Sequence, residues 1–311
     1  MRTSIRIFTI GALILFGVQS SGHAALKPLQ KTVDSLFTIA SSGEIRFTAM
    51  VQPAIDSIAA MGGAAVPFLT PKLGTSSARE RLTVINILKK IGAPAIPDLT
   101  VVLRGKNGLA SERAANALGE IGDSSAKEVL IESITHTSWQ VREEAVGALG
   151  KLKTASVADA IRSAFADSVG QVRKSAAVAV GRLKLKDLIP NLLAQLDDPF
   201  YGARMATRSS LFQLDTADVI ASLTPLVQSE RMLAREHAIF ILGQLRQPSA
   251  NGVLSTALKS ENPSTRSAAA MALWNSGSTT AQNEVMAFLA SETDSLTKIR
   301  VRSLIPKSAG K

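Results

Sequence analysis

The sequence predicts an all-α protein in which antiparallel helix pairs stack side by side as a solenoid. Three observations support this fold class. The chain repeats itself every 31 residues, the apolar residues within a repeat have helical spacing, and only 4% of the 311 residues are aromatic. Alanine and leucine must therefore form most of the core, which suits closely packed helices better than a sheet of aromatic and β-branched residues.

The repeat is clearest where "VREEAVGALGKL" (141–152) returns as "VRKSAAVAVGRL" (172–183). Three columns of residues keep this spacing. They are Arg142, Arg173, Arg204, Arg235 and Arg266; Leu118, Leu149, Val180, Leu211, Leu242 and Leu273; and Gly119, Gly150, Gly181, Phe212, Gly243 and Trp274. The pattern continues toward the N-terminus at a spacing of 30, through "INILKKIG" (85–92) and "IDSIAAMG" (55–62). Repetition at this period is typical of stacked helical repeats.

Each repeat is predicted to contain two helices. Apolar residues of the first helix share one helical face, as do Val141, Ala145, Ala148, Leu149 and Leu152. A second amphipathic stretch follows, for example "AIPDLTVVL" (95–103), in which Pro97 fits the first helical turn because the missing N–H costs little there. A single helix pair cannot bury its apolar face alone, so consecutive pairs must stack.

The glycine column is predicted to let neighbouring helices approach closely. A glycine inside a helix costs about 1 kcal/mol relative to alanine, so four glycines on one register indicate a packing reason. Phe212 and Trp274 replace glycine in this column. We expect these bulky side chains to alter the stacking, and with it the curvature, near them.

The N-terminal residues 1–25 are predicted to form a signal peptide. Arg2 and Arg6 precede an apolar stretch, and "GHAA" (22–25) offers small residues for cleavage after Ala24 or Ala25. The apolar stretch is shorter than the roughly 20 residues that a membrane span requires, although its retention as an anchor stays open. The protein is therefore expected to be exported, either to the periplasm or out of the cell, with no membrane span after cleavage.

The mature chain is expected to begin with a helical cap at residues 26–45. The repeats follow at residues 46–290, and a C-terminal cap with a basic tail occupies residues 291–311. The chain contains no cysteine, which excludes disulfides, thiolate metal sites and a cysteine nucleophile. An exported protein of this kind must be stabilised by its core alone.

The segment "WQVREEAVGALGKL" and its copies resemble HEAT repeats, in particular the short HEAT-like repeats of phycobilisome lyases. The resemblance covers residues 45–290, or about eight repeats. It implies a right-handed α-solenoid. It says little about function, because proteins of this family are mostly recognition scaffolds.

Two branches of this family are enzymes. Deoxyhypusine hydroxylases bind two irons through several His-Glu pairs, whereas this chain has one pair in the reverse order, Glu236–His237, and His136 as the other histidine of the mature chain. A di-iron site needs more nitrogen ligands than that. Phycobilin lyases act on cytosolic antenna proteins, which does not suit an exported chain. We therefore expect a non-enzyme without metal or cofactor, and keep the hydroxylase as a remote alternative.

The arginine column allows two interpretations. A cation in every repeat suits a phosphate polymer, but a structural ladder is favoured, because acids in the loops before the first helices lie near these arginines. Asp167 and Asp198 keep the 31-residue register, and Glu230 falls one position beyond it.

Two surface sites are predicted. The first is a basic patch for an anionic partner, made of Lys151, Lys153, Arg182, Lys184 and Lys186. Cations near helix C-termini also interact favourably with the helix dipole, which explains Lys151 and Arg182 better than the lysines that follow the helix end. The second is a protein-contact edge in the loops before the first helices, made of Trp139, Tyr201 and Met232. The alternative for this edge is that its side chains only staple the helix starts.

The leading hypothesis for function is an exported, non-catalytic scaffold or adaptor that binds another protein. The alternative is a binder of anionic polymers at the cell envelope, through the basic patch and the tail from Lys298 to Lys311. Nucleic acid is not favoured, because the aromatic residues of these loops are not interleaved with basic ones.

Overall fold

A computed structural model describes residues 22–305 of the chain. The predicted signal peptide therefore lies outside the described residues up to position 21, as does the end of the basic tail from position 306. Throughout the described part, the regular elements are α-helices and short 3-10 helices, and none is a strand. This confirms the all-α prediction.

Contacts divide the chain into two compact units, Met1–Ala95 and Ile96–Lys311. The described helices of the first unit are α1 (Gly22–Ala40), α2 (Thr48–Ala60), the single turn α3 (Val66–Leu69) and α4 (Ala78–Ile91). Helix α2 packs against both α1 and α4. An ion pair of 2.7 Å between Lys72 and Asp34 and another between Lys90 and Asp56 add links within this unit.

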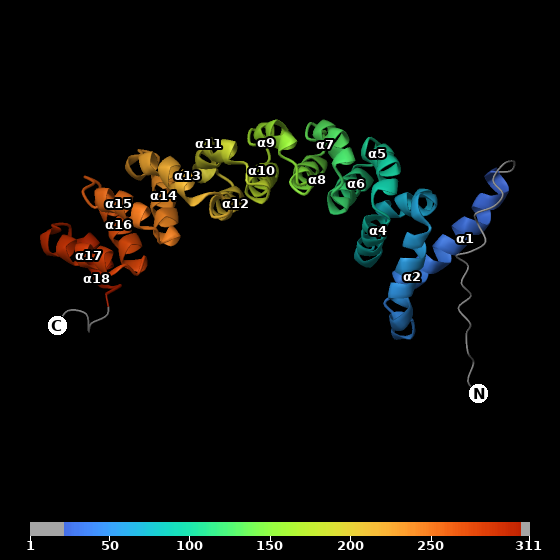
Figure 1. The fold of residues 1–311 in the computed structure, drawn as a ribbon, viewed down its shortest axis with the longest axis horizontal. Coiled ribbons are helices and arrows are strands. Elements are labelled where there is room, and N and C mark those ends of the chain that lie inside the picture. Colours follow the sequence, from blue (N-terminus) through green and yellow to red (C-terminus); the bar gives the residue numbers. More distant parts are fainter. Residues whose placement is uncertain (1–21, 306–311) are drawn as a thin grey trace. The chain divides into compact units, whose positions relative to one another are not determined.

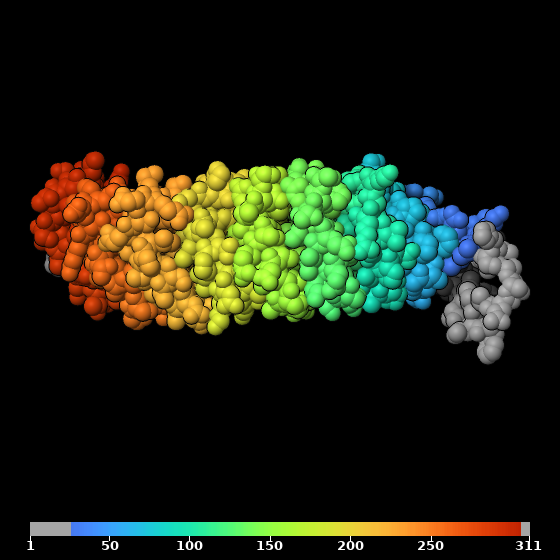
Figure 2. All heavy atoms as spheres, turned by 90° about the horizontal axis from the view of Figure 1, so that it is seen from above, coloured from blue at the N-terminus to red at the C-terminus, as the bar shows by residue number. Residues whose placement is uncertain are grey.

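The second unit is a solenoid of two helix layers (Figure 1). The first helices of the repeats form one layer: α6 (Gly108–Ile121), α8 (Trp139–Leu149), α10 (Gly170–Leu183), α12 (Tyr201–Leu211), α14 (Met232–Leu245), α16 (Pro263–Asn275) and α18 (Ser295–Arg302). The second helices form the other: α5 (Ile96–Leu103), α7 (Lys127–Ser133), α9 (Ala158–Ala164), α11 (Ile189–Ala194), α13 (Thr216–Leu223), α15 (Pro248–Ala257) and α17 (Thr279–Ser291). Figure 2 shows the repeats of this unit as successive bands.

The helix boundaries follow from local side-chain chemistry. Asn107 caps α6 by accepting a hydrogen bond from the backbone N–H of Ala110, and Asp215 caps α13 in the same way. Pro190 lies in the first turn of α11. In α13, the turn after Leu223 is a 3-10 helix, Thr224–Gln228, which begins around Pro225. Proline cannot continue the backbone hydrogen bonding of an α-helix, so α13 ends at Leu223.

The core consists of the columns identified in the sequence. Leu118, Leu149 and Val180 are fully buried, as are the alanines three positions after the arginine column. Those alanines are Ala145, Ala176, Ala238 and Ala269. Each first helix thus buries its apolar face against the helices of the neighbouring repeats, as the periodicity predicted.

The glycine column marks the closest approach between neighbouring first helices. A β-carbon placed on Gly150 would lie 2.9 Å from the Cβ of Ala179, and one on Gly119 would lie 2.8 Å from the Cα of Ala148. Gly181 and Gly243 meet Ser210 and Ala272 in the same way, again 29 residues further on. These distances are too short for a side chain, so the packing role predicted for the column is confirmed.

The stacking changes where phenylalanine replaces glycine. The neighbouring pairs α6–α8, α8–α10, α10–α12 and α14–α16 all pack extensively, whereas α12 and α14 make little direct backbone contact. Phe212 lies between them in the glycine column and is 42% exposed. This agrees with the expectation for Phe212. At Trp274 the effect is smaller, because α16 and α18 still pack against each other.

None of the described helices is long and apolar enough to cross a membrane by itself. The bent segment formed by residues 45–60 and 62–74 meets the criterion only when its two parts are taken together.

Gly147 within α8 and Gly150, the residue that follows its last turn, give a matched test of the close approach. Gly150→Ala should lower the free energy of unfolding by about 1–3 kcal/mol, because its Cβ would overlap Ala179. Gly147→Ala should be neutral or stabilise by up to about 1 kcal/mol, because nothing lies within 4 Å of the added carbon and alanine favours the helix. Urea unfolding followed by circular dichroism measures both. Equal effects of the two substitutions would contradict the packing role.

Candidate functional site

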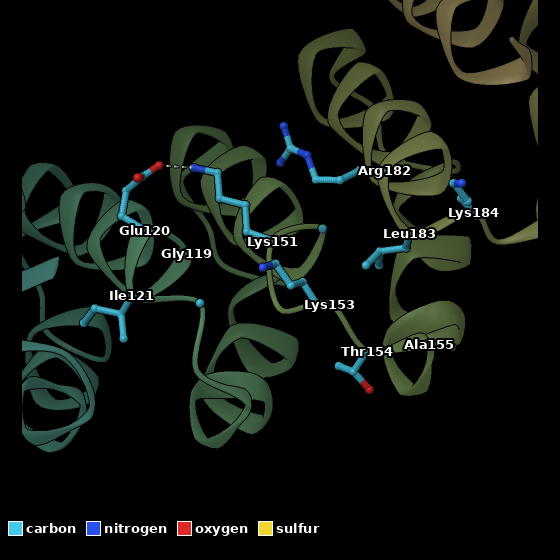
Figure 3. Close-up of a pocket in the computed structure, with 12 residues that line it drawn as sticks. Gly119, Glu120, Ile121, Lys151, Lys153, Thr154, Ala155, Arg182, Leu183 and Lys184 are labelled. Atoms are coloured by element: carbon cyan, nitrogen blue, oxygen red, sulfur yellow. Dashed lines mark hydrogen bonds and ion pairs between the residues drawn. The ribbon is translucent and has the colours of Figure 1, made fainter. Parts of the chain in front are cut away.

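A groove of about 620 Å³ opens where α6, α8 and α10 end (Figure 3). Four of the five residues of the predicted basic patch line it: Lys151, Lys153, Arg182 and Lys184. Lys186 is not part of the lining; it begins the next 3-10 helix and is exposed. We call this site the basic groove. Residues 31 apart in the sequence thus meet on one surface, as their register predicted.

The charges of the basic groove are only partly compensated. Lys151 forms an ion pair of 2.8 Å with Glu120, which precedes it by 31 residues. Arg182 holds the same position one repeat later, but its neighbours on this register are Lys151 and Gln213, and neither is an acid. Figure 3 shows Lys151 turned toward Glu120, with Arg182 extending from the next helix. Within the described residues, no ion pair forms at Arg182, Lys153 or Lys184.

The backbone at Lys153 and Lys184 is unusual for lysine. Both residues follow a first helix in the left-handed conformation, with φ of 53° and 54°. Gly92, Gly122 and Gly277 hold this register in three other repeats, and Arg246 holds it with a φ of 52°. A left-handed conformation costs a residue with a β-carbon about 1–2 kcal/mol, a cost that glycine avoids. The two lysines therefore keep their charges beside the groove in spite of a conformational cost.

The groove is suited to binding an anion. Its lining combines the four cations with the single carboxylate of Glu120, the hydroxyl of Thr154 and small or apolar residues. The adjoining helix C-termini carry partial negative charge, which the cations offset in part. No nucleophile with an activating base lies in this lining.

The arginine column forms hydrogen bonds on a fixed pattern. In each of the five arginines of the column, Nη1 donates to the backbone carbonyl six residues earlier, as Arg142 does to His136 at 2.9 Å. Three of the arginines also bind a carboxylate through two hydrogen bonds: Arg142 with Asp167, Arg173 with Asp198, and Arg266 with Glu292. These ion pairs are largely buried. We call each of them a rung of the arginine ladder.

The ladder differs from the sequence expectation in two respects. First, the carboxylate comes from the following repeat, 25 or 26 residues further on, whereas the loop before each helix supplies only the carbonyl. Second, the carboxylate is missing for Arg204 and Arg235, where Ser229 and Ser260 stand at the position of Asp167 and Asp198. Glu230, which the register had suggested, is exposed and does not pair with Arg204.

The predicted protein-contact edge lies at the start of the first helices. Trp139, Tyr201 and Met232 are the first residues of α8, α12 and α14, rather than members of the preceding loops. Tyr201 is 65% exposed and Met232 is 57% exposed, whereas Trp139 is half-buried. The exposed part of this edge therefore consists of Tyr201 and Met232.

Comparison with protein families identifies the repeat. The family model for HEAT repeats matches residues 96–181 and 226–305, which together make up more than half of the chain. The chain is a HEAT-repeat protein. Comparison with curated proteins finds no significant match.

Solved structures share the fold of this HEAT-repeat protein. The Escherichia coli protein YibA is 17% identical with a TM-score of 0.50, over 81% of this chain and 96% of YibA. Human deoxyhypusine hydroxylase is 20% identical with a TM-score of 0.37, over 81% of this chain and 97% of the hydroxylase. The CpcE–CpcF complex of phycocyanin lyase from Nostoc is 18% identical with a TM-score of 0.40, over 77% and 94%. At these identities, the similarity concerns the fold alone.

The two histidines of the repeats lie apart in this HEAT-repeat protein. His136 Nδ1 accepts a hydrogen bond of 3.0 Å from the backbone N–H of Ser138, before α8. His237 lies on α14, where burial and the charges of Arg208 and Arg204 lower its pKa. Among residues 22–305, no three histidine, aspartate or glutamate side chains group together as possible metal ligands.

The last rung of the ladder makes stability depend on pH. Hydrogen bonds from Arg266 lower the pKa of Glu292 from 4.5 to about 2. The rung therefore stabilises the fold fully above pH 4.5, and this contribution, on the order of 3 kcal/mol, is lost as the pH falls toward 2. Glu292→Gln should lower the free energy of unfolding by a similar amount at pH 7 and flatten its dependence on pH between 4.5 and 2. Urea unfolding at several pH values measures both effects.

The control is Glu261→Gln, which removes an exposed carboxylate at the start of the same repeat. It should leave the pH profile of the unfolding free energy unchanged. If the two variants have the same profile, the rung does not carry this stability.

Proposed function

We propose that this HEAT-repeat protein is a non-catalytic scaffold or adaptor that binds another protein. The observation that carries the proposal is the exposed edge of Tyr201 and Met232, on a stack whose alanine and leucine columns are buried. Tyrosine and methionine are enriched at protein interfaces and charged residues are depleted in interface cores. Helical repeat stacks also present long surfaces that suit protein recognition.

The proposal includes export from the cytoplasm. Its support is the sequence of residues 1–25, with two arginines, an apolar stretch and small residues before the cleavage position. The partner is then a protein of the periplasm or of the cell exterior. The absence of cysteine makes the test simple, because any introduced cysteine is the only thiol of the chain.

A thiol-directed photo-cross-linker tests both statements. Met232→Cys places the reagent on the proposed edge, and Val101→Cys, at a 73% exposed position on α5, is the matched control in the other helix layer. In intact cells of the source organism, a reagent that does not cross the cytoplasmic membrane should yield a discrete adduct with Met232→Cys only. Adding Tyr201→Ser should remove that adduct, because the remaining exposed apolar side chain of the edge is then lost.

Two outcomes contradict the proposal separately. The same adducts from both cysteine positions would show that the edge is not a binding surface. An adduct that forms only after the cells are permeabilised would leave the scaffold function intact and contradict export.

The basic groove favours a second candidate function, binding of an anionic polymer at the cell envelope. The supporting observation is that Arg182, Lys153 and Lys184 share one groove without an ion pair among the described residues. Such binding depends on counterion release and weakens steeply with salt. A protein partner that contacts apolar side chains is much less sensitive to salt.

Substitution of lysine by glycine tests this second candidate function without straining the backbone. Lys153→Gly with Lys184→Gly should preserve or raise the melting temperature, because both positions have positive φ. The double variant should elute from a heparin column at clearly lower salt than the wild type. Lys106→Ala with Lys259→Ala removes the same charge from exposed turns elsewhere and should elute between the two. Equal elution of both double variants would contradict a polymer site in the groove.

A further inference from the structure

The repeat pattern fails twice at the same place, between α12 and α14. Phe212 replaces the glycine at which neighbouring first helices touch, and the two helices make little direct contact. Ser229 replaces the aspartate that binds the ladder arginine elsewhere, so Arg204 keeps only its hydrogen bonds to backbone carbonyls. The guanidinium of Arg204 lies 5.5 Å from the ring centre of Tyr201.

A second arginine of α12 also lacks an acid. The guanidinium of Arg208 stacks on the ring of Phe240 in α14, with 3.8 Å between its carbon and the ring centre. Its Nε is buried and has no hydrogen-bond partner, and its Nη1 contacts only the sulfur of Met205 at 3.5 Å. Burial lowers the pKa of Arg208. A half-buried cation without a counterion is costly. The positive charge of Arg208 is therefore left uncompensated by the described residues.

The nearby carboxylates do not compensate the charges of Arg204 and Arg208. Asp197 is the acid whose charge reaches His237, and it is already paired with Arg231. Glu236 of α14 is exposed and forms no ion pair with the described residues. Burial, together with the positive charges of Arg208 and Arg204, lowers the pKa of His237. The surface between the two helices is therefore positive and carries two aromatic rings, those of Tyr201 and Phe240.

We propose that Arg204 and Arg208, together with Tyr201, bind an oxyanion carried on an aromatic or apolar group of the protein partner. This inference rests on the proposed scaffold function and specifies the chemistry of the partner. Guanidinium groups bind carboxylates and phosphates through paired hydrogen bonds. The exposed ring of Tyr201, 5.5 Å from the guanidinium of Arg204, supplies apolar surface beside them, and exposed Met232 begins the next first helix. The oxyanion is either the carboxylate of an acidic segment or a phosphate monoester.

Tyr201 is the only tyrosine of the chain, so 3-fluorotyrosine labelling of the full-length protein gives a single fluorine resonance at the site. Titration with phenyl phosphate and with benzoate should each shift this resonance in a saturable way. The tighter of the two ligands identifies a phosphorylated or an acidic partner segment. Benzyl alcohol, which has the ring without the charge, should cause no saturable shift.

Two variants separate binding from folding. Arg208→Met keeps the length of the side chain against Phe240 and removes the charge, and it should weaken the binding of both anions at least about tenfold. Ser229→Asp keeps every cation and restores the acid at the register of Asp167 and Asp198. It should raise the melting temperature and weaken the binding of both anions to a similar extent. Arg162→Gln, an exposed arginine on α9, should change neither affinity.

The inference is overturned if neither anion gives a saturable shift, or if both bind Arg208→Met and Ser229→Asp as tightly as the wild type. Such a result leaves the cross-linking test of the scaffold function unaffected, because that test does not depend on charge at α12. Conversely, anion binding without any cross-linked partner would retain the site and contradict the scaffold function on which the inference rests.

Discussion

The close contact between neighbouring first helices, through a column of residues without side chains, is the constraint on which the rest of this structure depends. At Gly119, Gly150, Gly181 and Gly243, the next helix comes so near that even a methyl group has no room. This proximity fixes the distance between repeats and aligns every other column. The buried alanines and leucines meet because of it, and a carboxylate 25 residues further on lies within hydrogen-bonding distance of the ladder arginine.

Features of functional interest lie where the regular pattern is interrupted. Arg182 is uncompensated because its register neighbour is another cation, and Lys153 takes a left-handed backbone conformation that Gly92, Gly122 and Gly277 take at the same register. Between α12 and α14, Phe212 removes the close contact and Ser229 removes an acid from the ladder. In a repeat protein, identical positions have nearly identical surroundings. A departure from the consensus therefore leaves a group without its usual partner, and that group becomes available to a ligand.

Much of this was accessible from the sequence, because the fold is governed by short-range periodicity. The helix pairs, the buried columns and the role of the glycines follow from spacing alone, and so does the meeting of Lys151 and Arg182 in one groove. The partners of the arginines were harder to predict. The relevant acid lies in the following repeat, and at Arg266 it is Glu292, which lies 26 residues away rather than 25.

The stacking of Arg208 on Phe240 also escaped sequence analysis. Arg208 stands at the register of five buried apolar residues, Ala115, Val146, Ala177, Ile239 and Ala270. An arginine in this apolar column was therefore a signal that the sequence offered, whereas Phe240 belongs to no repeated column. Similarly, the starts of α8, α12 and α14 fall at Trp139, Tyr201 and Met232 themselves, because the hydrogen-bonding pattern of the backbone fixes helix ends less regularly than apolar spacing fixes helix faces.

The missing rungs at Arg204 and Arg235 have a consequence for cooperativity. In a linear array, each repeat gains stability only from the repeats beside it, so cooperative unfolding extends no further than the weakest junction. The rungs from Arg142 and Arg173 tie α8, α10 and the turn before α12 into one block, and the rung from Arg266 ties α16 to the turn before α18 in another. Toward the preceding repeat, α14 packs on the 3-10 turns at Gln195–Asp197 and Thr224–Gln228 rather than on α12, whereas it packs directly against α15 and α16 on its other side. The junction between α12 and α14 is therefore where cooperative unfolding of this stack should stop first.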